Sequence, residues 1–109
     1  MRRQTGTLEL MILLAIMRLE DDAYGVPISR EIEETVGHSV ALASVYTTLN
    51  RLEARGLLTS ALGDPTPERG GRAKRVFTIT AKGVREVRES RRALIQLWNR
   101  IPQLKGQSS

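Results

Sequence analysis

The chain has 109 residues, of which 40% are hydrophobic and 27% are charged, which fits one globular domain and argues against a disordered protein. It contains no cysteine, which excludes disulfides and thiolate chemistry and fits a reducing cytoplasm. The net charge of +5 is uneven: residues 20–34 hold six acids and one Arg (−5), whereas residues 69–105 hold eleven Lys or Arg and two acids (+9). This division favours a polyanion such as nucleic acid as the partner, over basic side chains that merely solvate a helix.

The N-terminal segment predicts a buried helix. Thr5 or Thr7 is a suitable N-cap, and residues Leu8–Leu19 are apolar on nearly every side of a helix. Such a helix either lies at the centre of the core or contacts a second subunit on one side. The uninterrupted apolar run Leu10–Met17 is short for a signal peptide and far too short to span a bilayer, so no membrane association is expected.

A second helix is predicted to begin near Tyr24–Val26, because Pro27 is tolerated in the first turn of a helix and not deeper. It should end before Gly37, a residue type that favours helix C-termini. Its polar side is acidic, which indicates a supporting helix and not one that lies on phosphates. The connection His38–Ala41 is consistent with the turn of a helix-turn-helix. His38 is the only histidine and has no companions at ligand spacing, so no metal site is expected.

The third predicted helix, Leu42–Arg55, presents two contrasting faces. An apolar stripe recurs at steps of three and four residues, formed by Leu42, Val45, Leu49 and Leu52. The opposite face is small or hydrogen-bonding and also includes Ala43 and Ala54. A helix fits the major groove, where Asn can bind adenine and Arg can bind guanine or a phosphate. The residues expected to contact DNA from this helix are Ser44, Tyr46, Thr47, Asn50 and Arg51.

Each of these residues also has a plainer interpretation. Ser44 and Thr47 could be small surface residues, and Arg51 could form an ion pair within the helix. The ring of Tyr46, at the border of the two faces, could be packed or could place its hydroxyl on a phosphate. Tyr24 allows the same two interpretations.

The next segment predicts two strands, Leu57–Leu62 and Ala73–Thr80, joined by a loop that Pro65 and Pro67 keep out of the sheet. In the second strand, Val76 and Thr78 should face one way, and Phe77 and Ile79 the other. Basic residues and glycines suit a wing that lies along a DNA groove and contacts the backbone, with a solvated loop as the alternative. The residues expected to contact DNA here are Arg69, Gly70, Gly71, Arg72, Lys74 and Arg75.

Thr80 is predicted to cap a last helix that Pro102 closes. Because a long helix after a compact domain has little of its own to pack on, its apolar stripe should pair with the first helix and with a second subunit. Trp98, the only tryptophan, would pack in the dimer or form an aromatic wall for a flat effector. The expected dimer or effector seam comprises Leu10, Leu14, Val87, Leu94, Trp98 and Ile101.

The order and spacing of several motifs resemble the PadR family of transcriptional regulators, in its short form with a single C-terminal helix. The matching residues are Ala23-Tyr24-Gly25, the run from Leu42 to Leu57 (LASVYTTLNRLEARGL), the run from Gly70 to Thr80 (GGRAKRVFTIT) and Gly83. The resemblance covers about Leu8 to Trp98. It implies a dimeric winged helix-turn-helix, usually a repressor, often inactivated by a small molecule and without catalytic activity. It also favours DNA-backbone contacts for Tyr24 and Tyr46. Phe77 departs from the family pattern, which commonly has Tyr there, so this chain lacks the hydroxyl that the family commonly carries at this position.

The expected fold is therefore mainly α (α+β): a winged helix-turn-helix over residues 1–80, a C-terminal dimerisation helix over 81–102 and a disordered tail over 103–109. The expected function is a cytoplasmic, sequence-specific DNA-binding regulator, a ligand-responsive repressor that binds double-stranded operator DNA as a homodimer. A small aromatic effector is a candidate partner, and no cofactor is expected. The alternative is a winged-helix adaptor that binds proteins without DNA. The predicted strands lack the paired aromatic residues on which an RNA-binding sheet stacks bases. The chain also has no Cys, no second His and no phosphate loop that would support an enzyme.

Overall fold

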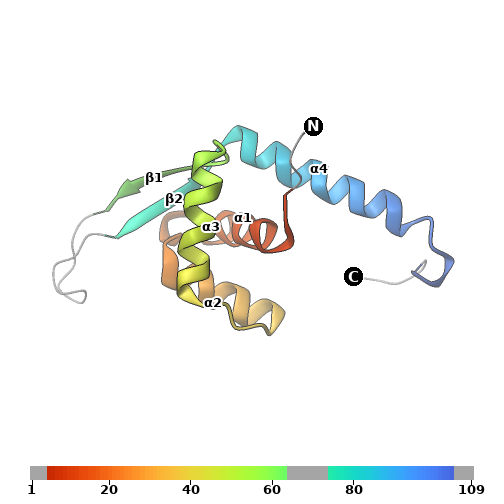
Figure 1. The fold of residues 1–109 in the computed structure, drawn as a ribbon, viewed down its shortest axis with the longest axis horizontal. Helices are drawn as coiled ribbons and strands as arrows, with labels where there is room; N and C mark the ends of the chain where they lie inside the picture. Colours follow the sequence, from red (N-terminus) through yellow and green to blue (C-terminus); the bar gives the residue numbers. More distant parts are fainter. Residues whose placement is uncertain (1–4, 64–73, 105–109) are drawn as a thin grey trace.

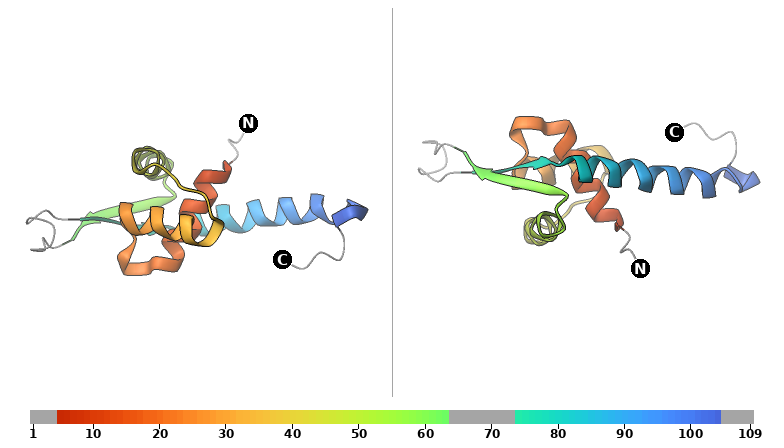
Figure 2. Two further views of the ribbon diagram at one scale, coloured as in Figure 1. Left: turned by 90° about the horizontal axis from the view of Figure 1, so that it is seen from below. Right: turned by 90° about the horizontal axis from the view of Figure 1, so that it is seen from above.

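The computed structural model describes residues 5–63 and 74–104. The elements in chain order are α1 (Thr7–Leu19), a 3-10 turn η1 (Glu20–Asp22), α2 (Gly25–Val36), α3 (Leu42–Ala54), β1 (Leu58–Leu62), β2 (Arg75–Ile79), α4 (Ala81–Trp98) and a 3-10 turn η3 (Pro102–Leu104). The first three helices pack together, the strands leave this body at one end and α4 extends from the other (Figure 1). The resulting molecule measures 55 × 31 × 21 Å, and α3 lies on one face of it (Figure 2). The predicted mainly α winged-helix architecture is confirmed.

The first two helices begin and end close to the expected residues, with one correction. The N-cap of α1 is Gly6, and neither Thr5 nor Thr7 takes that position. The Gly6 N–H donates to the Glu9 carboxylate at 2.8 Å, whereas the Thr5 hydroxyl donates to Glu86 of α4 at 2.6 Å. The predicted limits of α2 are confirmed, because Gly37 adopts the left-handed conformation (φ 84°) that ends this helix.

The last helix starts as predicted but ends earlier. The Thr80 hydroxyl accepts a hydrogen bond from the Gly83 N–H at 3.0 Å, as expected for an N-cap. The helix ends at Trp98 and not at Pro102. The chain then folds back, and the Trp98 indole N–H donates to the Leu104 carbonyl at 3.2 Å. Residues 103 and 104 are therefore part of a 3-10 turn and not of a frayed tail, while residues 105–109 lie outside the described residues.

The two strands form an antiparallel pair, with Leu58 opposite Ile79 and Leu62 opposite Arg75. They are shorter than predicted, and Ala73 lies outside the described residues. The Phe77 N–H donates to the Ala23 carbonyl at 2.8 Å, so the residues just before α2 are bound to β2. This bond fixes the middle of β2 to the helical body.

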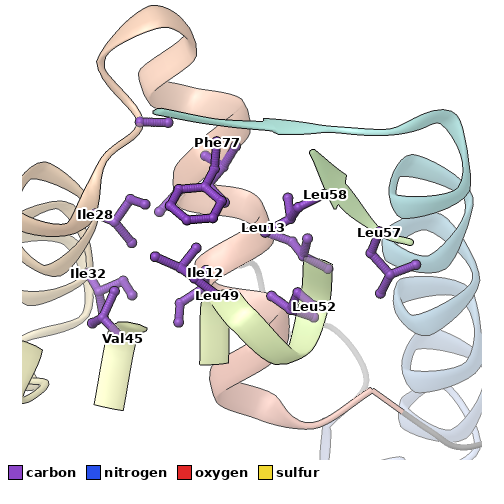
Figure 3. Close-up of a cluster of buried hydrophobic side chains, with 13 residues drawn as sticks. Ile12, Leu13, Ile28, Ile32, Val45, Leu49, Leu52, Leu57, Leu58 and Phe77 are labelled. Atoms are coloured by element: carbon purple, nitrogen blue, oxygen red, sulfur yellow. The ribbon is translucent and has the colours of Figure 1, made fainter. Parts of the chain in front are cut away.

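The core joins all three N-terminal helices to the strands (Figure 3). Phe77 is 1% exposed, so its ring has a packing role and occupies no surface position that would favour a hydroxyl. Leu42, at the start of the apolar stripe of α3, is the first residue of the helix and is 40% exposed, whereas Thr48 is buried. The buried hydrophobic residues are Ile12, Leu13, Ala15, Ile16, Ala23, Ile28, Ile32, Val45, Leu49, Leu52, Leu57, Leu58 and Phe77.

The two halves of α4 have different surroundings. In the first half Gly83 and Glu86 are buried, and Val87 packs against the core. Every residue from 91 to 103 is exposed, and the second half extends beyond the helical body in both views of Figure 2. Across residues 5–63 and 74–104, none of the helices has both the length and the apolar composition needed to cross a membrane.

Candidate nucleic-acid interface

The polar face of α3 is exposed along its length. Ser44, Asn50 and Arg51 are exposed, and in the described part of the chain none of these side chains has a hydrogen-bond or ion-pair partner. The alternative in which Arg51 forms an ion pair within the helix is therefore not seen. The exposed Thr47 hydroxyl donates to the Ala43 carbonyl at 3.0 Å, which leaves its methyl group and an oxygen lone pair for an external partner. Small side chains at Ala43 and Ala54 let another surface approach this face closely.

Tyr46 combines the two interpretations of its ring. Its side chain lies so close to Gly25, the first residue of α2, that a Cβ atom there would overlap the ring and the hydroxyl. Tyr46 nevertheless remains 42% exposed. It is thus packed on one side and accessible on the other, beside the N-terminus of α2.

The start of β2 also reaches the start of α2. The Lys74 ammonium lies 4.6 Å from the centroid of the Tyr24 ring, a distance at which a cation is attracted to an aromatic face. Tyr24 is the N-cap of α2, whose first turn carries no acid. A lysine, two tyrosines and the positive end of a helix therefore gather where a phosphate would be stabilised.

Arg75 is connected to α3 through the strand pair. Its guanidinium donates to the Ser60 hydroxyl at 2.9 Å, and that hydroxyl donates to the Glu53 carboxylate at 2.7 Å. The sequence interpretation missed Ser60 and Glu53, which connect Arg75 of β2 to α3. Four other residues predicted for the wing, Arg69, Gly70, Gly71 and Arg72, lie outside the described residues.

Comparison with known proteins agrees with this geometry. The model of the transcriptional regulator PadR-like family matches residues 13–89. The chain belongs to the PadR-like family. Over 89 residues it is 36% identical to the transcriptional regulator Rv3488 of Mycobacterium tuberculosis. The matched residues are 82% of this chain and 77% of that protein. The predicted resemblance is confirmed, and the chain is a transcriptional regulator and not an enzyme.

Solved structures show the same fold. A PadR-like transcriptional regulator from Bacillus cereus aligns with a TM-score of 0.72 and 22% identity, over 94% of this chain and 95% of that one. A PadR-family regulator from Eggerthella lenta aligns with a TM-score of 0.69 and 24% identity, over 93% of this chain and 89% of that one.

The residues predicted for the seam of this PadR-like regulator fall into two groups. Leu14, Leu94, Trp98 and Ile101 are between 42% and 60% exposed, whereas Leu10 and Val87 are half-buried and Val87 packs against the core of its own domain. Further exposed apolar residues that the sequence interpretation did not include are Met17, Ile95 and Leu97. The apolar surface of α4 is therefore wider than a single stripe.

Leu14 also lines an apolar groove between α1 and α2, together with Met11, Ala15, Ile32 and Val36. The groove borders the core, because Ala15 and Ile32 are buried core residues, whereas Leu14 and Val36 are exposed. Where the structure describes the PadR-like chain, no group of three His, Cys, Asp or Glu residues could hold a metal ion.

Proposed function

We propose that this PadR-like regulator binds operator DNA as a homodimer, with α3 of each subunit in a major groove. The observation that carries the proposal is the exposed face of α3, on which Ser44, Asn50 and Arg51 have no partner in the described part of the chain. Unpaired amide and guanidinium groups on the exposed face of a helix suit hydrogen bonding to base edges.

The surrounding residues divide into those that select a sequence and those that bind any DNA. Asn50 and Arg51 would contact bases. Ser44 and Thr47 have shorter side chains and would contact DNA groups that lie closer to the helix. Tyr24, Tyr46, Lys74 and Arg75 would contact the phosphate backbone, which fixes the orientation of the protein without reading the sequence. The wing residues 69–72 would add further electrostatic affinity.

The homodimer is supported by the apolar surface that one subunit leaves uncovered. Leu94, Trp98 and Ile101 belong to a segment in which every residue from 91 to 103 is exposed, and Leu14 is 52% exposed on α1. An apolar surface of this kind on a small domain marks an interaction site. Two copies related by a two-fold axis would place their recognition helices on half-sites about one helical turn, roughly 34–36 Å, apart or a multiple of it.

Regulation would follow from the same arrangement. A dimer bound at a promoter would exclude the polymerase, so the proposed effect is repression in the cytoplasm. A flat aromatic effector that binds at the dimer seam beside Trp98 would alter the dimer and release the DNA. Because Trp98 is the only tryptophan, quenching of its fluorescence reports such binding directly. If no flat cationic or phenolic compound quenches it, the effector proposal fails.

The DNA-binding proposal is tested by selecting the tightest sequences from random duplex DNA and measuring their affinity over a series of salt concentrations. The proposal expects a selected sequence with two related halves, and an affinity that falls linearly with salt on logarithmic axes. The rival function, a winged-helix adaptor without DNA, predicts no enriched sequence and no salt-dependent binding.

A further inference from the structure

The end of the recognition helix is bonded to the beginning of α4. The Thr80 hydroxyl donates to the Gly56 carbonyl at 2.8 Å, and the Thr80 N–H donates to the Leu57 carbonyl at 3.0 Å. The Lys82 ammonium donates to the Arg55 carbonyl at 2.9 Å. Three consecutive carbonyl groups at the end of α3 are thus bound by two residues at the start of α4.

The Arg55 side chain adds a second connection at the same place. Its guanidinium lies 3.5 Å from the Glu9 carboxylate of α1 and 3.9 Å from the Glu86 carboxylate of α4. These carboxylate side chains are 5% and 8% exposed, and the Arg55 side chain is 20% exposed. Thr5 contributes as well, since its hydroxyl donates to Glu86 and accepts from Arg55 at 3.4 Å. Because buried carboxylates are stable only with charged or hydrogen-bonding partners, this cluster fixes three elements relative to one another.

We propose that Arg55 is a positioning residue, which fixes the direction of the recognition helix relative to α4. The inference rests on the proposed DNA-binding homodimer. The core holds α3 through Val45, Leu49 and Leu52, and the bonds from Thr80 and Lys82 hold the carbonyl groups that follow the helix. Arg55 is the C-cap of α3, and its side chain reaches two other helices, so it holds the C-terminal end of α3 against both α1 and α4. The pairing of α4 between subunits then sets both the distance and the angle between the two recognition helices.

Arginine suits this role better than lysine. Its planar guanidinium offers donors in several fixed directions and can contact two carboxylates at once, whereas an ammonium group is a single point of charge. Glu9 and Glu86 each make at least one further interaction, so we expect variants of Arg55 to fold. Removal of the side chain should therefore loosen the angle of α3 and not abolish the domain.

The dependence of affinity on the spacing between half-sites reports how firmly this angle is fixed. The experiment uses the operator selected from random DNA and versions of it whose centre is lengthened or shortened by one or two base pairs. Affinities are measured for the wild type, Arg55→Met, Arg55→Lys and Glu86→Gln. Arg85→Met is the matched control, because Arg85 is an exposed cation of α4 outside the cluster. Thermal unfolding of each variant shows that it is folded at the temperature of the measurement.

In the wild type, a change of spacing should weaken binding strongly. In Arg55→Met the ratio of affinities between the best and the altered spacing should fall by about threefold or more, with a smaller fall in Arg55→Lys and Glu86→Gln and none in Arg85→Met. If Arg55 had a merely structural role, its loss would weaken binding equally at every spacing. That result would overturn this inference and leave the proposed function standing. If Arg55→Met does not fold, Arg55→Lys and Glu86→Gln give the same comparison. A wild type that binds no DNA at all would overturn the proposed function and this inference with it.

Discussion

Gly83 of α4 lies directly against the backbone carbonyl oxygen of Leu57. A Cβ atom at position 83 would overlap that oxygen and the side chain of Ile79. The missing side chain allows α4 to begin close enough for the hydrogen bonds from Thr80 to Gly56 and Leu57 to form. The close approach therefore fixes where α4 leaves the domain, and with it the direction of the half-helix that carries Trp98.

The first prediction concerns the stability of this close approach. Gly83→Ala should lower the free energy of unfolding by about 1–3 kcal/mol, the usual cost of overfilling a packed site. The carbonyl oxygen belongs to the backbone and cannot move aside without breaking the bond from Thr80. Chemical denaturation followed by circular dichroism measures the change.

Gly25→Ala is the matched comparison for Gly83→Ala. A Cβ atom at position 25 would meet the end of the Tyr46 side chain, which is partly exposed and can turn away. Since alanine also favours helix over glycine, the free energy of unfolding should change by less than about 1 kcal/mol. Equal decreases in the two variants would contradict this account of Gly83.

The fold was predictable wherever a local rule acts on neighbouring residues. Pro27 and Gly37 limit α2, and the Thr80 hydroxyl caps α4, because each of these effects involves residues a few positions apart. The prediction failed at Pro102, since a proline shows where a helix cannot continue and not where it has already ended. The exposure of Leu42 could not be predicted, because helical periodicity gives the direction of a side chain and not the place where the core stops.

The candidate site was predictable in part for the same reason. The exposure of Ser44, Asn50 and Arg51 follows from the periodicity of one helix. The contact between Arg55 and Glu9 joins residues 46 positions apart, and no local pattern indicates it. Glu86 offered one signal, because helical spacing places it on the same face as Gly83 and Val87, where a buried acid needs a partner.

A second prediction separates base recognition from backbone binding. Asn50→Ala should weaken binding to the selected operator by about 1–3 kcal/mol while leaving non-specific DNA unaffected, because a base contact discriminates between sequences. Lys74→Ala should weaken binding to all sequences alike and reduce the slope of log affinity against log salt by about 0.9. Fluorescence anisotropy with operator and scrambled DNA measures both effects. An Asn50→Ala protein whose affinity falls equally for the two DNAs would show that Asn50 does not read a base.

A third prediction concerns the wing residues outside the described part of the chain. Arg69→Ala combined with Arg72→Ala should weaken binding on all DNA sequences alike and reduce the salt slope by roughly 0.9 for each phosphate that is no longer neutralised. The sequence selected from random DNA should stay the same, because phosphate contacts carry no sequence information. An unchanged salt slope would count against a role for these two arginines.

The last prediction concerns the homodimer. Leu94 is 60% exposed in one subunit, so Leu94→Glu should leave the folded domain intact and destabilise only an interface that buries this position. Gln96→Glu is the control, since it adds the same charge to α4 on another side of the helix. Analytical ultracentrifugation at micromolar concentration should show dimers for the wild type and Gln96→Glu, and monomers for Leu94→Glu.

The affinity of Leu94→Glu for an operator with two half-sites should fall by about 100-fold or more, because each subunit then binds alone. Trp98 fluorescence offers an independent readout, since its emission should shift to the red when the interface opens. A wild type that is monomeric at micromolar concentration would refute the homodimer.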